Sequence, residues 1–259
     1  MNLSNPFSLA GKTALINGAS RGIGLAIAQG AAAAGANVIL ASRSLPQLEA
    51  RASELRGQGL LAEARKLDMA DNESIDAAAA ALPEVDILIN VAGTNIRKRF
   101  TEYTQEEYET IMQTNLHGIA RLTKLVGGRM VERGKGGKIV HIGSLMSVLG
   151  LPYLTVYAMT KSALAGLTRT LAAEWGRYNI QVNCIAPGFI ITDLNRAMWQ
   201  QPVMKQWLKT AQASPRTGVP EDIAPVAVFL SSAASDYVTG QVIAVDGGYT
   251  TTSVWPFEA

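Results

Sequence analysis

Apolar residues gather in seven short runs along the chain, and more polar stretches separate them. The runs are rich in Ile, Val and Leu and mostly do not alternate with polar residues. They are Thr13–Ile16, Val38–Leu40, Leu61–Leu67, Ile87–Asn90, Ile139–Ile142, Val182–Ile185 and Val242–Val245. Such runs are typical of strands that are buried on both faces of a parallel sheet.

The stretches between the runs carry apolar residues at helical spacing. They predict helices at Arg21–Ala34, Pro46–Arg56, Asn72–Leu82, Gln105–Arg133, Val156–Tyr178 and Glu221–Ser231. Strand and helix alternate along the whole chain, which predicts an α/β fold with a doubly wound parallel sheet of about seven strands and helices on both faces. No linker or repeat interrupts this pattern, so we expect residues 1–259 to form a single domain.

Composition narrows the functional classes. The net charge is +2, with no charge block that would indicate nucleic-acid binding. The longest apolar stretch is broken by Gln29, Asn37 and glycines, and the first residues lack a signal-peptide pattern, so we expect neither a membrane span nor secretion. One cysteine, Cys184, excludes an intrachain disulfide and favours a cytoplasmic protein. No His, Cys and Asp cluster has metal-ligand spacing, so we predict no catalytic metal, and we expect both histidines to be structural.

A glycine-rich loop follows the first predicted strand and opens the first predicted helix. It reads "NGASRGIG" and spans Asn17–Gly24. Glycines in this context allow a tight turn and the close approach of a pyrophosphate to the helix N-terminus, where free N–H groups attract an anion. The residues expected to bind a dinucleotide here are Gly18, Ser20, Arg21, Gly22, Ile23 and Gly24, and the fold is then of the Rossmann type.

The residues at the end of the second strand indicate which nicotinamide cofactor, NAD(H) or NADP(H), the site prefers. An NAD site commonly carries an acid about 20 residues beyond the loop, whereas this chain has Ser42 and Arg43. Arg43 and Arg21 could pair with a ribose 2′-phosphate, which a carboxylate would repel. We therefore predict that NADP(H) is preferred and that NAD(H) is possible. The alternative is that both arginines are solvated loop residues.

Two further strand ends offer contacts to a nucleotide. Asp68 and Met69 follow the third strand, where the Asp68 carboxylate could accept the adenine amino group; the alternative is a turn or helix-cap residue. The fourth strand ends in "NVAG", where Asn90, Ala92 and Gly93 leave room for the cofactor.

Four polar residues form the candidate reactive set. Tyr157 and Lys161 are four residues apart on a predicted helix and therefore share a face. Ser144 follows the fifth strand, and Asn115 lies on the long preceding helix. We expect this set at the carboxyl edge of the sheet, where such folds bind ligands. The alternatives are a surface helix pair and a turn hydroxyl.

With these motifs in order, the sequence resembles the single-domain short-chain dehydrogenase/reductase family. The matching residues are Gly18, Gly22, Gly24, Asn90, Ala92, Gly93, Asn115, Ser144, Tyr157, Lys161, Pro187, Gly188, Asp246, Gly247 and Gly248. They cover almost the entire chain. Two flanking positions depart from the pattern: Asn17 stands where the family commonly has Thr, and Val91 where it often has Asn.

The resemblance implies hydride transfer between a nicotinamide cofactor and a ketone or secondary alcohol. Tyr157 would exchange the proton, because a neighbouring cation such as Lys161 favours the tyrosinate form. Lys161 would also bind the nicotinamide ribose, Ser144 the substrate oxygen, and Asn115 a water that leads to solvent. Tyr157 and Lys161 thus also count as cofactor-binding residues, together with Pro187, Gly188, Ile190 and Thr192 beside the nicotinamide.

The substrate region is expected to include a mobile lid at about residues 190–215. The candidate substrate residues are Arg97, Met146, Tyr153, Phe189 and Asn195, with Met198, Trp199, Met204 and Trp207 making the lid apolar. The basic stretch Arg97–Arg99 could recruit a carboxylate, or could be a solvated loop. Within the family, the chain is most similar to the gluconate 5-dehydrogenase-like branch of sugar-acid and polyol oxidoreductases, which implies a small polar carbonyl substrate.

Two alternatives stay open. A 3-oxoacyl-thioester reductase would need a basic surface for its acidic carrier, which Arg129, Arg133, Lys135 and Lys138 could supply. A non-catalytic cofactor-binding scaffold would be expected to have a broken reactive set. The resemblance further implies a homotetramer, with the long helices paired across an interface and the tail residues Trp255, Pro256 and Phe257 close to a neighbouring site.

Overall fold

The computed structural model describes residues 5–193 and 195–253. They form one seven-stranded parallel sheet in the order β3-β2-β1-β4-β5-β6-β7. The strands are β1 (Thr13–Asn17), β2 (Asn37–Ser42), β3 (Ala62–Lys66), β4 (Ile87–Asn90), β5 (Gly137–Ile142), β6 (Ile180–Pro187) and β7 (Val242–Val245). The predicted doubly wound sheet is confirmed, and every predicted strand is present.

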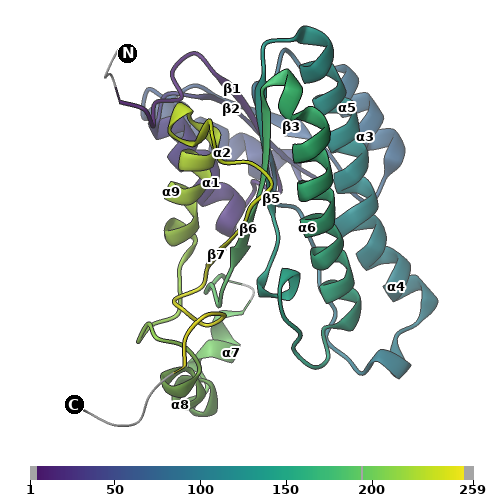
Figure 1. Cartoon of the computed structure of the whole chain (residues 1–259), viewed down its shortest axis with the longest axis vertical. Helices are drawn as coiled ribbons and strands as arrows, with labels where there is room; N and C mark the ends of the chain where they lie inside the picture. Colours follow the sequence, from purple (N-terminus) through teal and green to yellow (C-terminus); the bar gives the residue numbers. More distant parts are fainter. Residues whose placement is uncertain (1–4, 194, 254–259) are drawn as a thin grey trace.

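Helices cover both faces of the sheet (Figure 1). One face carries α1 (Gly22–Ala33), α2 (Leu45–Gly57) and α9 (Pro220–Ser231); the other carries α3 (Asn72–Ala80), α4 (Gln105–Met112), α5 (Gly118–Arg133) and α6 (Thr155–Trp175). Successive strand residues point to opposite faces. Ile16 and Leu40 therefore pack under the first group of helices, while Leu15 and Ile39 pack under the second.

Two details differ from the sequence-based expectation. The edge strands β3 and β7 are largely half-buried rather than fully covered. The predicted helix Gln105–Arg133 is interrupted by a π-helical turn, Gln113–His117, between α4 and α5. Beyond that turn a Cβ on Gly118 would lie 2.2 Å from the carbonyl oxygen of Met69, so only glycine allows the helix to approach this closely.

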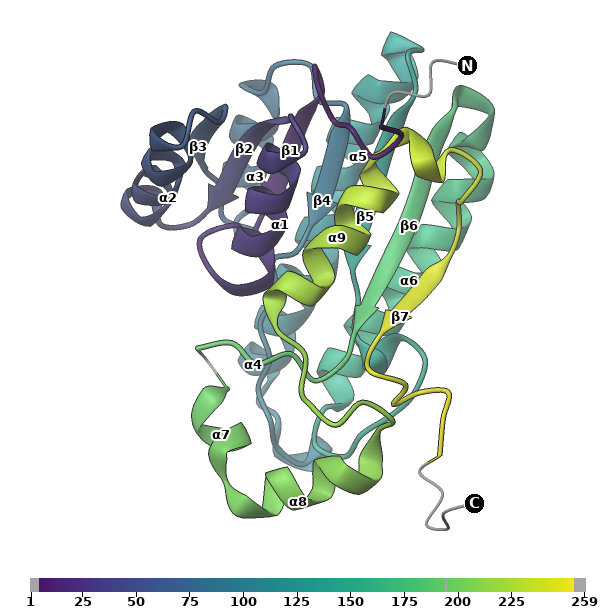
Figure 2. The same cartoon turned by 90° about the vertical axis from the view of Figure 1, so that its left-hand side faces the viewer.

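Beyond the carboxyl ends of the strands lie two further helices, α7 (Arg196–Gln200) and α8 (Pro202–Ala211) (Figure 2). Short 3₁₀ turns occupy Phe100–Glu102, Leu145–Ser147, Gly176–Tyr178 and Ala233–Ser235. None of the described helices is long and apolar enough to cross a membrane. The described ranges also contain no metal-binding cluster of His, Cys, Asp or Glu. The tail residues Trp255, Pro256 and Phe257 lie outside the described residues.

Candidate active site

The glycine loop between β1 and α1 is shaped for close contact with a ligand. Gly18 has φ +74°, and a Cβ there would lie 2.7 Å from the backbone nitrogen of Ala92. A Cβ on Gly24 would lie 2.2 Å from the carbonyl oxygen of Gly18. Arg21, the N-cap residue of α1, makes no side-chain capping hydrogen bond. The first N–H groups of the helix therefore face the loop without a side-chain partner, as an anion site requires.

One buried polar atom stands out at the end of β2. The Ser42 hydroxyl is buried and makes no hydrogen bond to any residue that the structure describes. Arg43 and Arg21 are both exposed, and within the described ranges neither forms an ion pair. A buried hydroxyl normally has a hydrogen-bond partner. Ser42 and the two cations therefore suit the ribose end of a phosphorylated dinucleotide, and no acid stands among them.

A buried polar network joins β1, β4 and β5, and sequence reasoning missed it. The Asn17 amide accepts the N–H groups of Val91 (3.0 Å) and Ala92 (2.8 Å), and it donates to Asn90 Oδ1 (2.5 Å). Asn90 Nδ2 donates to Thr123 Oγ1 and lies 3.1 Å from His141 Nδ1. Asn17 thus shapes the backbone after β4, which explains how a residue other than Thr serves at this position.

His141 and Cys184 lie deep in the sheet. Burial, together with the Lys161 cation, lowers the pKa of His141 to about 4. Burial also raises the pKa of the Cys184 thiol to about 11, which leaves it protonated and unreactive near neutrality. The other histidine, His117, is exposed at the end of the π-helical turn.

The two residues after β3 have local structural roles. Asp68 Oδ1 accepts the N–H of Ala70 (2.9 Å), as in an Asx turn, and the N-cap of α3 is Asp71 instead. The Met69 side chain is buried in the core, so only its backbone can meet a cofactor. The turn alternative for Asp68 is therefore present in the structure, and an adenine contact by its carboxylate stays a prediction.

Tyr157 and Lys161 lie on the first two turns of α6. The Lys161 ammonium is 5.6 Å from the centre of the Tyr157 ring and donates to the Ile142 carbonyl at 2.7 Å. The Lys161 residue is 3% exposed, whereas Tyr157 is half-buried. A cation fixed beside a phenol stabilises its deprotonated form, so the pair has the arrangement that proton exchange requires.

Ser144 is held by a neighbour that sequence reasoning missed. Its N–H donates to Ser147 Oγ (3.2 Å), and its own Oγ accepts the N–H of Met146 (3.2 Å). Ser147 Oγ in turn donates to the Lys161 carbonyl (2.9 Å), and Ser162 Oγ donates to the Met146 carbonyl (2.9 Å). Two hydrogen bonds therefore join the 3₁₀ turn Leu145–Ser147 to α6. The spacing Ser144-x-x-Ser147, a capping pattern, was the available signal.

Asn115 holds the loop that follows β4. Its Oδ1 accepts the N–H of Thr94 (2.7 Å) and its Nδ2 donates to the Thr94 carbonyl (2.8 Å). Nδ2 also lies 3.4 Å from Thr160 Oγ1, while Oδ1 keeps a second lone pair, so the expected water remains a prediction. Asn115 Oδ1 and Lys161 Nζ nevertheless lie 3.5 and 3.7 Å from where a Cβ on Gly93 would stand, so both groups border the same glycine.

The loop after β6 lies over the glycine loop. A Cβ on Gly188 would lie 2.5 Å from Asp246 Cα, and one on Gly22 would lie 3.4 Å from Thr192 Cγ2. Asn195 donates to the Ile190 carbonyl (2.9 Å) and accepts the Thr192 N–H (2.8 Å). We expected Asn195 to contact substrate; its amide is used by the loop backbone instead, so we reassign it to holding Ile190 and Thr192 in place.

The other predicted substrate residues lie in different environments. Met146 is 2% exposed and packs with Leu145 and Leu154, so it supports the site from the core and does not offer a substrate contact as expected. Phe189 is half-buried and packs against that cluster, as does Tyr157. Tyr153, four residues before Tyr157, is exposed and has a left-handed backbone with φ +67°.

The basic stretch after β4 leaves one cation without a carboxylate among the described residues. Lys98 pairs with Glu107 (2.7 Å) and Arg99 with Glu102 (3.6 Å). Arg97 is exposed, and its Nη1 lies 3.3 Å from the Met198 sulfur on α7. The solvated-loop alternative therefore fits Arg99, whose side chain is 72% exposed, but not Lys98, and Arg97 is the side chain that reaches the lid.

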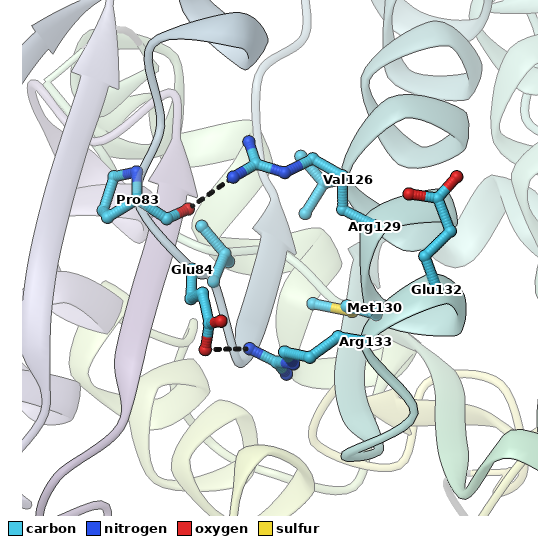
Figure 3. A pocket seen from close by; sticks show the side chains of 8 residues that line it. Pro83, Glu84, Val126, Arg129, Met130, Glu132 and Arg133 are labelled. Atoms are coloured by element: carbon cyan, nitrogen blue, oxygen red, sulfur yellow. Dashed lines mark hydrogen bonds and ion pairs between the residues drawn. The ribbon is translucent and has the colours of Figure 1, made fainter.

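The four cations proposed for an acidic carrier are engaged elsewhere. Two of them, Arg129 and Arg133, line a cavity of about 340 Å³ between the segment before β4 and the end of α5, at the amino edge of the sheet (Figure 3). Arg129 donates to the carbonyls of Ala79, Leu82 and Pro83. The ion pairs are Arg133 with Glu84 and Asp86, Lys135 with Glu84, and Lys138 with Asp236. All four cations thus already have partners within the chain, and the acidic-carrier alternative stays a prediction.

The geometry agrees with comparisons to known proteins. The profile of a family described as enoyl-(acyl carrier protein) reductase matches residues 18–250. The chain belongs to the short-chain dehydrogenase/reductase family. Gluconate 5-dehydrogenase of Gluconobacter oxydans (strain 621H) is 38% identical over 96% of this chain and 99% of that protein. The 5-keto-D-gluconate 5-reductase of Escherichia coli (strain K12) is 36% identical over 95% and 98%.

A solved structure extends the likeness to three dimensions. The gluconate 5-dehydrogenase from Burkholderia cenocepacia J2315 in complex with NADP and tartrate superposes with a TM-score of 0.91, at 37% identity, over 95% of this chain and 98% of that one. The protein is thus an oxidoreductase that acts on CH–OH groups, and the predicted family and reaction class are confirmed.

Proposed function

We propose that the protein is an NADP(H)-dependent reductase that interconverts a keto-sugar acid and its secondary alcohol. The observation that carries the substrate class is Arg97, whose guanidinium reaches the lid without a carboxylate partner among the described residues. The relatives named above act on gluconate and 5-keto-D-gluconate, both of which carry one carboxylate. A cation beside the lid is the kind of group that binds such a carboxylate.

The residues present fit a phosphorylated dinucleotide. The glycine loop has no room for a Cβ at Gly18 or Gly24, so its backbone can approach a pyrophosphate closely. The buried Ser42 hydroxyl has no hydrogen-bond partner among the described residues and could bond to the cofactor. Arg21 and Arg43 would hold the 2′-phosphate, and Lys161 the nicotinamide ribose. The bound cofactor supplies the hydride that reduces the substrate carbonyl. An uncharged Ser42 would also tolerate NAD(H) at lower efficiency.

The chain itself binds the carbonyl and moves the proton. Ser144 and Tyr157 would donate hydrogen bonds to the substrate oxygen, and Tyr157 would give up its proton as negative charge develops there. Lys161, fixed by the Ile142 carbonyl, stabilises the resulting tyrosinate. In the oxidative direction Tyr157 takes the same proton back. Asn115 contributes by holding Thr94, and through it the loop that carries Arg97.

The lid completes the site by excluding water. The segment of residues 190–215 contains α7 and α8, and Phe189 packs on Trp199 and Trp207 with ring centres 5.2 Å apart in both pairs. We propose that these helices open for substrate and close for reaction. Together with the sheet they would form one catalytic domain.

The assembly and cellular location are part of the same proposal. We propose a homotetramer in which α5 and α6 pair with their counterparts, because Met159 is exposed on α6 and Gly128 and Gly166 leave open space for close approach. A single buried cysteine, Cys184, suits the reducing cytoplasm. Native mass spectrometry of the full chain tests the tetramer, which a monomer would contradict.

A substrate panel tests the function. NADPH absorbance would be followed with 5-keto-D-gluconate, with an uncharged keto-hexose and with a 3-oxoacyl thioester, and the first repeated with NADH. We expect the highest kcat/KM for 5-keto-D-gluconate with NADPH. A higher kcat/KM for the thioester would identify an acyl reductase instead, and no turnover of any carbonyl, with NADPH bound, would favour a scaffold.

A further inference from the structure

One buried donor in the lid has no acceptor among residues 5–193 and 195–253. Trp199, on α7, is 6% exposed, and its indole Nε1 is buried without a hydrogen-bond partner in these ranges. An indole N–H can only donate, and buried indoles usually find an acceptor. A buried donor without an acceptor is rare and calls for a specific explanation.

Trp199 belongs to a part of the lid that contacts two regions of the candidate site. Its ring packs on Phe189, which contacts the cluster of Leu145, Met146 and Leu154 that also holds Tyr157. The adjacent residue, Met198, touches Arg97 through its sulfur at 3.3 Å. Helix α7 therefore connects the cluster around the reactive tyrosine with the cation that would bind the carboxylate.

We propose that the Trp199 indole N–H donates a hydrogen bond to a hydroxyl oxygen of the bound keto-sugar acid, which makes Trp199 a specificity-determining residue. The inference rests on the proposed function. In such a substrate the carbon chain between the carboxylate and the keto group carries hydroxyl groups. With the carboxylate on Arg97 and the carbonyl on Tyr157, these hydroxyl groups are the acceptors that the substrate offers to a donor on the lid.

The test compares a hydroxylated substrate with a bare one. Trp199→Phe keeps an aromatic ring and removes the donor, and the two substrates are 5-keto-D-gluconate and 5-oxohexanoate, which lacks hydroxyl groups. We expect Trp199→Phe to lower kcat/KM about tenfold for 5-keto-D-gluconate, the equivalent of about 1.4 kcal/mol. For 5-oxohexanoate we expect a change within about twofold.

Trp207→Phe is the matched control, because Trp207 stacks on Trp199 with ring centres 6.4 Å apart and is 36% exposed. Trp207→Phe removes an indole from the same aromatic cluster. We therefore expect it to change kcat/KM for both substrates by the same factor. An equal loss on both substrates in Trp199→Phe would show a packing role and overturn the proposal. An unchanged kcat/KM for 5-keto-D-gluconate would overturn it as well.

A measurement on the native enzyme covers the case in which Trp199→Phe does not fold. Single-deoxy analogues of 5-keto-D-gluconate remove one hydroxyl at a time. One of them should lose about tenfold in kcat/KM, and equal values for all would contradict the proposal. Failure of the proposed function looks different: the native enzyme would then prefer the 3-oxoacyl thioester or turn over no carbonyl.

Discussion

Ser147 links the two halves of the reactive set: its hydroxyl donates to the Lys161 carbonyl at 2.9 Å and accepts the Ser144 N–H at 3.2 Å. Ser144, the serine proposed to bind substrate, is thereby held in a fixed position relative to the helix that carries Tyr157 and Lys161. Geometry of this kind controls rate, because small displacements of reacting groups are costly. Ser147 itself lies outside the group of residues that touch substrate.

Removing this link should slow the reaction more than it weakens the fold. We expect Ser147→Ala to lower kcat about tenfold with little change in KM for NADPH, and to lower the free energy of unfolding by about 1 kcal/mol. Steady-state kinetics and urea unfolding check both values. Ser162→Ala, which removes the other hydrogen bond between α6 and the turn, is the control and should have a smaller effect on kcat. A native kcat in Ser147→Ala contradicts the positioning role.

Tyr157→Phe should abolish nearly all turnover while leaving cofactor binding intact. The substitution removes the hydroxyl that exchanges the proton but keeps the ring beside Lys161. Loss of a positioned acid costs about 100- to 10,000-fold in rate. Turnover is followed by NADPH absorbance and binding by fluorescence titration. Retained turnover would refute the assignment of the proton to Tyr157.

Arg43→Asp, with Ser42 kept, should turn the cofactor preference toward NAD. The change removes a cation from the end of β2 and adds the acid that a ribose 2′-hydroxyl favours. We expect the ratio of kcat/KM for NADPH over NADH to fall about 100-fold, as loss of a charged hydrogen bond and new repulsion imply. Arg51→Asp, the same charge change at an exposed position of α2, should leave the ratio unchanged. An unaltered ratio in Arg43→Asp would show that Arg43 is a solvated loop residue without a role in cofactor preference.

The periodic pattern of the sequence predicted the sheet well because strand burial and helix spacing are local properties. The π-helical turn at Gln113–His117 was not visible, since it depends on a tight approach of Gly118 to the Met69 carbonyl. The edge strands β3 and β7 are half-buried because each has only one neighbouring strand. The order of strands in the sheet cannot be deduced from composition. Apolar runs alone did not separate central strands from edge strands.

In the candidate site, too, residue types could be predicted from the sequence, whereas contacts that depend on the fold could not. The residue types of Ser144, Tyr157 and Lys161 indicated chemistry, whereas the partners of side-chain amides did not show in the sequence. Asn115 and Asn195 both looked free to bind ligands, yet each closes a hydrogen-bonded loop with nearby backbone. Such pairings depend on which loops the fold brings together, so only the structure could reveal them.

Arg97→Gln should weaken the reduction of acidic substrates selectively. Arg97 is the member of the basic stretch that lacks a carboxylate partner among the described residues, so its charge is available to a ligand. We expect kcat/KM for 5-keto-D-gluconate to fall about 10- to 100-fold and that for an uncharged keto-hexose to stay within about twofold. Arg99→Gln, two residues away and paired with Glu102, is the control. Equal losses on both substrates would point to a structural role of Arg97.

The buried imidazole of His141 should make stability depend on pH in the acid range. Its pKa is lowered from 6.5 to about 4 because burial and the nearby Lys161 cation disfavour its charged form. Above about pH 6.5 the side chain is neutral in both folded and unfolded chains and contributes nothing. Between about pH 6.5 and 4 the unfolded chain binds a proton that the folded one does not, so the free energy of unfolding falls as pH falls.

The loss from this one group amounts to about 3 kcal/mol across that interval. Urea unfolding at about pH 7 and pH 4.5 measures it, and His141→Asn should show a distinctly smaller decrease than the native chain because it has no proton to bind. His117→Asn is the matched control: that histidine is exposed, so its replacement should leave the decrease as it is. Parallel losses in the native chain and in His141→Asn would show that other groups, and not the buried imidazole, set the acid sensitivity.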